Sequence, residues 1–305
     1  MDIHWDEGSP ECGKSAHSPL QVHTYNPQTF ILRESLCSTF EAPFLYLLLG
    51  SSKALLIDTG DVADSQKMPL AKTVLDLVPQ NGSGKLPLLV VHTHRHLDHR
   101  SGDGQFTSLP SVQVVGYDLP SVKRFYQFSD WPNGIAQIDL GERVVDVIPS
   151  PGHNETEVSF YDRSTALLFS GDFLMPARLL IDDTRAEQAS AERLAVFVKD
   201  RPVSYILGGH IETDTNGHLF PWESQNHPQE HALQMTKADV FALPAAVRKF
   251  NGFYTEDGTF VMMNSMRILL FIAAVTLVLI IALGWLLVRY FRRRRQRAAM
   301  NRQRP

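Results

Sequence analysis

The sequence predicts an α+β fold, an αββα sandwich of two mixed β-sheets flanked by helices, followed by one C-terminal transmembrane helix. Two observations predict the sandwich: apolar runs of strand length follow one another early in the chain, and later ones alternate with helix-length segments. A third observation, an uncharged apolar stretch over residues 268–288, predicts the membrane helix.

Short apolar runs predict the strands, and the longer segments between some of them predict the helices. The expected strands are residues 30–32, 44–49, 54–57, 88–91, 112–115, 144–148, 158–161, 166–169 and 203–207. The expected helices are residues 69–77, 119–125 and 186–200, with a further one at 229–241.

Composition divides the chain into five parts. Residues 1–20 are rich in Gly, Pro, Ser and charge, which indicates a flexible N-terminal arm. Residues 21–250 should form the folded domain, because a chain of 305 residues that is 44% hydrophobic can bury one substantial core. A connector at 251–266, a membrane helix at 267–289 and a basic tail at 290–305 complete the expected organisation.

The net charge of −4 conceals an asymmetry. Nine of the 29 basic residues lie at or after Arg267, where there is no Asp or Glu, so the first 266 residues carry 20 basic and 33 acidic side chains, a net charge of −13. So acidic a domain repels a phosphate backbone, which argues against nucleic acid as a partner and against nuclease activity. No obligate protein partner is evident from the sequence.

The stretch from Ile268 to Val288 is 21 residues long and, as a helix, would span about 30 Å of hydrocarbon. Trp285 and Tyr290 stand where aromatic side chains often mark the membrane interface, and four consecutive arginines follow. The sequence therefore predicts a single-pass membrane protein whose basic tail contacts anionic lipid headgroups.

Two observations conflict about its orientation. The basic tail favours a cytoplasmic C-terminus and an extracytoplasmic, for example periplasmic, catalytic domain. Export requires an N-terminal signal, and residues 1–19 contain no apolar core, so either a signal peptide precedes the given start or the protein is tail-anchored in the cytoplasm. Cys12 and Cys37 either form a disulfide or remain two buried thiols. We favour the exported orientation.

The segment His94-Arg95-His96-Leu97-Asp98-His99 directly follows the apolar run 88–91. Three imidazoles and a carboxylate within six residues are typical of a metal site, because divalent metals such as zinc bind imidazole nitrogen and carboxylate oxygen. His92 precedes this motif by one alternation and either supports the ligands or is a buried structural residue.

Three further segments each place one metal-binding side chain beside glycine after an apolar stretch: Gly152-His153, Gly171-Asp172 and Gly209-His210. A lone histidine near a strand is more often structural than ligating. If these residues were all structural, however, each of the segments would have to carry a metal-binding residue type in this order by chance. Five histidines and two aspartates suffice for two metal ions that share a bridging carboxylate.

On these motifs the segment from Phe30 to His210 resembles the metallo-β-lactamase fold superfamily of hydrolases, with Asp58-Thr59-Gly60 similar to its first motif. The resemblance implies the same αββα sandwich and a glyoxalase II-like or lactonase-like set of ligands. It places His94, His96 and His153 on the first metal, Asp98, His99 and His210 on the second, and Asp172 between the two. Asp58 is expected to orient a ligand loop rather than to ligate.

The expected activity is that of a binuclear metal-dependent hydrolase, with two divalent ions that are Zn²⁺ or, alternatively, Fe or Mn. Metal-activated hydroxide would attack a thioester, a lactone or a related small-molecule ester, and Asp98 would both ligate and orient the nucleophile as the catalytic residue. Protonation of the leaving group is not assigned to any residue.

Three alternatives remain open at this stage. The superfamily's lactamases usually have Cys or Ser where Asp172 stands, which argues against β-lactam hydrolysis but leaves it as an alternative. An iron-dependent, persulfide dioxygenase-like oxidoreductase and a non-catalytic binding protein are the others. Aromatic residues either line a substrate cleft or pack in the core; they are Phe40, Phe44, Trp131, Phe220 and Trp222.

Overall fold

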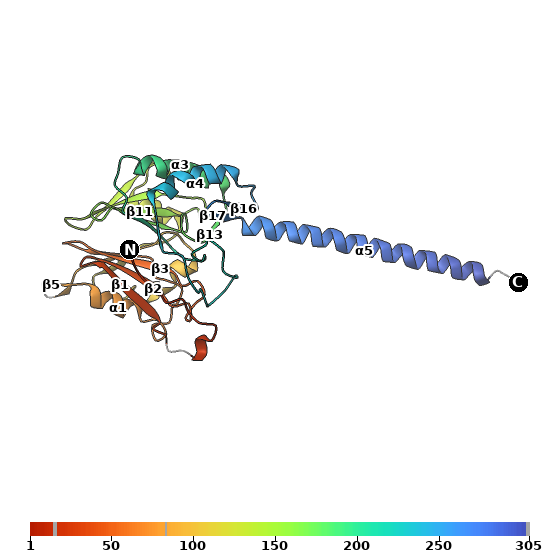
Figure 1. The fold of residues 1–305 in the computed structure, drawn as a ribbon, viewed down its shortest axis with the longest axis horizontal. Coiled ribbons are helices and arrows are strands. Elements are labelled where there is room, and N and C mark those ends of the chain that lie inside the picture. The colour runs from red at the N-terminus through yellow and green to blue at the C-terminus, as the bar shows by residue number, and fades with distance from the viewer. Residues whose placement is uncertain (15–16, 83, 303–305) are drawn as a thin grey trace. The chain divides into compact units, whose positions relative to one another are not determined.

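The computed structural model describes residues 1–14, 17–82 and 84–302, and the chain divides into two compact units. The first runs from Met1 to Met263 and contains all of the sheets, and the second runs from Asn264 to the C-terminus (Figure 1). Each unit is described by itself below.

The first sheet has six strands in the order β1-β2-β3-β4-β7-β8. Neighbours from β1 to β4 are antiparallel, whereas β4, β7 and β8 are parallel. Its strands are β1 (Leu20–Asn26), β2 (Thr29–Glu34), β3 (Phe44–Leu49), β4 (Ala54–Ile57), β7 (Leu88–Val91) and β8 (Val112–Val114). β3 is buried throughout, as expected of an inner strand covered on both faces.

The second sheet also has six strands, in the order β15-β14-β12-β11-β10-β9. Only β12 and β14 are parallel; the other pairs are antiparallel. Its strands are β9 (Ala136–Asp139), β10 (Val144–Pro149), β11 (Val158–Asp162), β12 (Leu167–Gly171), β14 (Tyr205–Gly208) and β15 (Gln234–Met235). Both sheets are therefore mixed, as the sequence predicts.

Alternating side chains of the strands form the layers of the sandwich. On β3, Tyr46 and Leu48 belong to the core shared with the second sheet, whereas Leu45 and Leu47 face the cluster that contains α1 (Leu70–Leu77). The second sheet's outer face packs against α3 (Thr184–Val198) and α4 (Lys237–Lys249), which lie together over β11 in Figure 1. The predicted αββα arrangement is confirmed.

Shorter elements connect these layers. They are α2 (Leu119–Tyr126), the 3₁₀ turns Cys12–Lys14, Leu97–His99 and Ser101–Gln105, and the hairpin of β5 (Gln80–Asn81) and β6 (Gly84–Lys85). The helix expected at 229–241 instead begins at Lys237, where Thr236 and Asp239 form a capping box.

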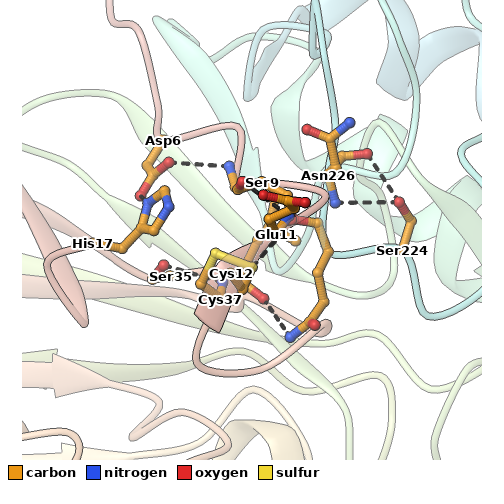
Figure 2. The surroundings of a disulfide bond; sticks show 12 residues. Asp6, Ser9, Glu11, Cys12, His17, Ser35, Cys37, Ser224 and Asn226 are labelled. Carbon is orange, nitrogen blue, oxygen red and sulfur yellow. Dashed lines mark hydrogen bonds and ion pairs between the residues drawn. A yellow bond between two sulfur atoms is a disulfide. The ribbon is translucent and has the colours of Figure 1, made fainter. Parts of the chain in front are cut away.

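The N-terminal segment differs from the flexible arm expected over residues 1–20. Trp5 is only 5% exposed and packs edge-on against Phe44, with 4.9 Å between ring centroids. Cys12 and Cys37 form a disulfide (Figure 2). The composition of the segment is polar, but one buried indole and one covalent cross-link attach it to the first sheet.

Residues 251–266 differ from the expected connector. They contain a hairpin of β16 (Tyr254–Asp257) and β17 (Phe260–Met263), and β17 pairs in parallel with β13 (Arg178–Leu180). Phe260 and Met262 are buried against the α3 and α4 layer. The partner strand is distant in the sequence, so no local pattern of residues indicated this small sheet.

The second unit is essentially one helix, α5 (Ser265–Arg302). Its part from Ser265 to Arg295 has a mean hydropathy of 2.9 over its most apolar window, and none of that window is buried. By length and composition alone, this helix is a candidate membrane span.

A buried ion pair fastens the two sheets together. The guanidinium of Arg143, just before β10, donates to both carboxylate oxygens of Asp162, at 3.1 and 2.7 Å. It also donates to Thr29 Oγ1 and to the carbonyl oxygens of Gln28 and Leu49, which belong to the first sheet and the turn beside it. Both charged side chains are at most 5% exposed.

We expect Arg143→Ala to lower the free energy of unfolding by about 3–5 kcal/mol, because it leaves the Asp162 carboxylate buried without its partner. Lys72→Ala is the matched control, since Lys72 and Asp76 form an exposed ion pair on α1 whose loss should cost at most about 1 kcal/mol. Chemical denaturation measures both values, and equal losses in the two variants would contradict the assigned role of Arg143.

Candidate metal centre

The predicted ligands lie at the carboxyl ends of strands from both sheets. His94 to His99 follow β7, His153 follows β10, Asp172 follows β12 and His210 follows β14. Ligand sites in sheets with parallel strands commonly form at this edge, because the chain leaves each strand there in a loop. Segments that are far apart in sequence therefore converge.

The first group consists of His94, His96 and His153. Nδ1 of His96 lies 2.9 Å from Nε2 of His94 and 2.9 Å from Nε2 of His153. Nδ1 of His153 donates to the carbonyl oxygen of Leu180 at 2.7 Å, since a carbonyl can only accept. That contact turns Nε2 of His153 toward the group, where it is the ring nitrogen that a metal would bind.

The second group consists of Asp98, His99, Asp172 and His210. Nε2 of His99 lies 3.3 Å from both Asp98 Oδ2 and Asp172 Oδ1, and Nε2 of His210 lies 3.3 and 3.5 Å from the same two oxygens. Nδ1 of His210 donates to the carbonyl oxygen of Glu41 at 2.7 Å, so Nε2 is the ring nitrogen that faces the two carboxylates.

All seven predicted ligands lie in these two groups, and within each group the potential ligand atoms lie within 4.8 Å of one another. Asp172 faces both groups, because its Oδ2 is 3.6 Å from His153 Nε2 while its Oδ1 faces His99 and His210. That Oδ1 is buried and has no hydrogen-bond partner among the described residues. An unsatisfied buried carboxylate oxygen is costly, and a cation would satisfy it, so the donor set fits divalent metal ions.

The electrostatics favour ionised Asp98 and Asp172 and a neutral His94. Burial alone would raise the pKa of Asp98 and of Asp172, but the adjacent His99 and His210 lower both well below the ordinary value. Burial, reinforced by His99, holds the pKa of His94 well below its usual range. Neutral imidazole and ionised carboxylate are the protonation states that bind metal.

His99 is different, because three carboxylates surround it. Burial would lower the pKa of His99, but Asp172, Asp98 and Asp58 raise it well above its ordinary value. The charge that attracts a proton here also attracts a metal ion, so metal binding at the second group should displace that proton.

Asp58, which follows β4, orients the ligand loop as predicted. Its carboxylate accepts hydrogen bonds from the Thr93 backbone N–H at 2.7 Å and from the Thr93 hydroxyl at 2.9 Å. Its Oδ2 lies 3.0 Å from Nδ1 of His99 and fixes the orientation of that ring. His92 contacts Asp103 at 2.8 Å and belongs to neither group, so its role is structural.

The sequence analysis did not identify Glu157, which holds the backbone of Asp172 in place. Its Oε1 accepts a hydrogen bond from the Asp172 backbone N–H at 3.1 Å. Burial, with Asp172 and Glu187 nearby, raises the pKa of Glu157 well above the ordinary value. No spacing in the sequence marks it, because it acts through a backbone contact across the sheet.

A cleft with a volume of about 210 Å³ opens onto the two groups. Of the ligands, five line it: His96, Asp98, His153, Asp172 and His210. Its other walls come from residues 40–41, 175–180, 212 and 220–227, and include Met175, Arg178, Leu180, Glu212, Glu223, Ser224 and His227. No local pattern of residues indicates these positions, since they surround the site only after folding.

The predicted cleft aromatics divide into two sets. Phe40, Phe220 and Trp222 line the cleft. Phe44 is fully buried in the core shared by the sheets, and Trp131 packs against Phe128, so neither lines this cleft. The cleft thus combines aromatic side chains with charged residues such as Arg178 and Glu212.

We expect Asp58→Asn to weaken metal binding at the second group by about 10–100-fold, because it removes the anionic partner of His99 Nδ1. Asp103→Asn is the control, since Asp103 contacts His92 rather than a ligand of either group. Titration of metal-free protein with zinc measures the affinities, and unchanged affinity in Asp58→Asn would contradict the role assigned to this carboxylate.

Comparison with known proteins agrees with this geometry. The chain is 26% identical over 231 residues to the acyl-coenzyme A thioesterase MBLAC2 of Gallus gallus, an alignment that covers 64% of this chain and 80% of that protein. It is 24% identical over 167 residues to the hydroxyacylglutathione hydrolase of Rhodospirillum rubrum, covering 52% of this chain and 60% of that protein. Relatives of these two kinds indicate a hydrolase.

The solved metallo-beta-lactamase from Pontibacter korlensis has a similar fold, with a TM-score of 0.51 and 16% identity over 76% of this chain and 100% of that one. The profile of the metallo-beta-lactamase superfamily matches residues 39–210, a segment that contains all seven predicted ligands. The chain therefore belongs to the metallo-β-lactamase superfamily.

Proposed function

We propose that this protein is a binuclear, zinc-dependent hydrolase that cleaves an acyl thioester. The observation that carries the proposal is the placement of Asp172 between a three-histidine group and a second group with a further carboxylate. Such an arrangement suits two divalent ions bridged by one carboxylate. The thioesterases and hydroxyacylglutathione hydrolases among its relatives support a thioester substrate.

Two bound divalent ions would supply a water of lowered pKa and would polarise the substrate carbonyl. The chain's own residues position the reaction. Asp98 lines the cleft beside His210, where its carboxylate can accept a hydrogen bond from the attacking water and so orient it. His94 and His99 are buried behind the cleft, held by Thr93 and Asp58.

The leaving group favours a thioester over a simple alkyl ester. A thiol has a pKa of about 8.5, so a thiolate leaves without prior protonation. An alkoxide is far more basic and needs a general acid. Glu41 lines the cleft, and burial raises its pKa to about 7, but a thiolate leaving group does not need its proton.

We also propose that residues 268–288 cross a membrane once, with the metal centre outside the cytoplasm and the basic tail inside. The disulfide between Cys12 and Cys37 supports this orientation, because disulfides persist in oxidising compartments. The arginines after Arg289 support it as well, since basic residues are retained on the cytoplasmic side.

Substitution of a ligand should abolish hydrolysis without unfolding the domain. We expect His94→Ala and Asp98→Ala each to lower kcat/KM for an acyl thioester by on the order of 10³-fold, as expected when a group that stabilises the transition state is lost. His218→Ala is the control, because this exposed histidine lies outside both groups.

Hydrolysis of thioester, lactone and β-lactam substrates, with metal content measured alongside, tests this expectation. A wild-type rate in Asp98→Ala at matched metal content would contradict the mechanism. Bound iron together with oxygen uptake would contradict the proposed hydrolase activity and would indicate an oxidoreductase.

Fusions to alkaline phosphatase, which is active only outside the cytoplasm, test the topology. We expect a fusion after Met263 to be active and a fusion after Pro305 to be inactive, because the span reverses the side of the membrane. The opposite pattern, or inactivity of both fusions, would favour the cytoplasmic tail-anchored form.

A further inference from the structure

Three segments distant in sequence meet beside the cleft, and we call them the clasp: residues 7–12, 35–37 and 225–229. The backbone N–H of Ser9 donates to the Gln225 carbonyl at 2.9 Å, and that of His227 donates to the Glu7 carbonyl at 2.8 Å. Between these bonds, Gly8 pairs with Asn226 in an isolated antiparallel bridge. The N-terminal segment thus runs antiparallel to the 225–229 segment over a short stretch.

The third segment of the clasp is attached by side chains. The disulfide joins Cys12 to Cys37, and Gln225 Nε2 donates to the Leu36 carbonyl at 3.0 Å (Figure 2). Gly8 lies where all three segments meet, with a φ of +69°. A Cβ at this position would lie 2.1 Å from the Gln225 carbonyl oxygen and 2.8 Å from Leu36 Cβ, so only glycine fits there.

The clasp holds one wall of the cleft. Residues 220–227 contribute Phe220, Trp222 and His227 to that wall. They belong to the segment between β14 and β15, which has only isolated bridges of its own. A long segment with so little regular structure depends on contacts from elsewhere for its position.

Side-chain contacts connect the clasp to the ring residues that line the cleft. The ring of His227 stacks on Phe220, with 4.2 Å between centroids and 6° between planes. His227 Nδ1 contacts Glu230 Oε1 at 2.9 Å, and Glu230 forms a buried two-point ion pair with Arg33, at 2.6 and 2.7 Å. A displacement of residues 225–229 would therefore move the rings of His227 and Phe220.

We propose that the clasp is a positioning element for substrate recognition: it holds residues 220–227 as a wall over the metal centre, and the Cys12–Cys37 disulfide locks it. The proposal rests on the proposed thioester hydrolysis. The clasp touches none of the seven ligands through the contacts described above, so its release should weaken substrate binding while the metal groups persist. A displaced wall loses contacts that hold the substrate in both the bound state and the transition state, and such a loss raises KM more than it lowers kcat.

Two neighbouring glycines provide a matched pair of variants. Gly8→Ala places a methyl group against the Gln225 carbonyl, whereas Gly13→Ala places one where no described heavy atom lies within 4 Å. The double variant Cys12→Ser/Cys37→Ser removes the lock without adding bulk. These variants are compared with the wild type as full-length, zinc-loaded protein in detergent.

We expect Gly8→Ala and the double cysteine variant to raise KM for an acyl-coenzyme A thioester by about tenfold, as expected when contacts common to the bound substrate and the transition state are lost. Their kcat should change less than KM, their zinc content should remain that of the wild type, and Gly13→Ala should behave as the wild type. An unchanged KM in Gly8→Ala and the double variant, or a loss of zinc equal to the loss of activity, would overturn the proposal.

Hydrogen exchange of residues 220–229 provides a readout that needs no activity. The His227 N–H, which donates to Glu7, should exchange faster in Gly8→Ala and in the double variant than in Gly13→Ala. If the wild type cleaves no thioester, the proposed function fails while this exchange still tests the clasp. Equal exchange in all variants would show that the N-terminal segment does not hold the wall.

Discussion

The structure is organised around two carboxylates, the partly exposed Asp98 and the buried Asp172, placed among imidazole rings at the edge where both sheets end. The negative charge of Asp172 lies out of water, and its Oδ1 has no hydrogen-bond partner among the described residues. Such charges require cations, and the surrounding contacts prepare for them: carbonyl oxygens of Leu180 and Glu41 fix two rings, and Asp58 fixes a third. The two sheets position the loops that follow β7, β10, β12 and β14, and these loops bring the two carboxylates and the five imidazole rings together.

Much of this arrangement could be predicted from the sequence because it is encoded locally. The uninterrupted apolar run over residues 44–49 marked the strand β3, and the residues that follow β7 carry four ligands within six positions. Each remaining ligand stands beside a glycine at the end of an apolar run, as Asp172 does. Short-range patterns of this kind do not depend on contacts with distant segments, so they can be recognised from the sequence alone.

The features that escaped prediction depend on contacts between distant segments. β13 pairs with β17 across about eighty residues, Glu157 acts on Asp172 through a backbone bond, and Arg178 enters the cleft beside Glu212 and Trp222 only after folding. The clasp is the clearest case, because a polar N-terminal segment resembles a loose arm until Gly8 is seen between Leu36 and Gln225. Loops that surround a site are therefore less predictable than the ligands within it.

Calorimetric titration of the metal-free, full-length protein with zinc tests the central claim most directly. The account predicts two ions bound per chain, and predicts that Asp172→Asn weakens both binding events, because its two oxygens face different groups. Binding of a single ion, or two binding events of which only one responds to Asp172→Asn, would contradict a centre built on one shared carboxylate.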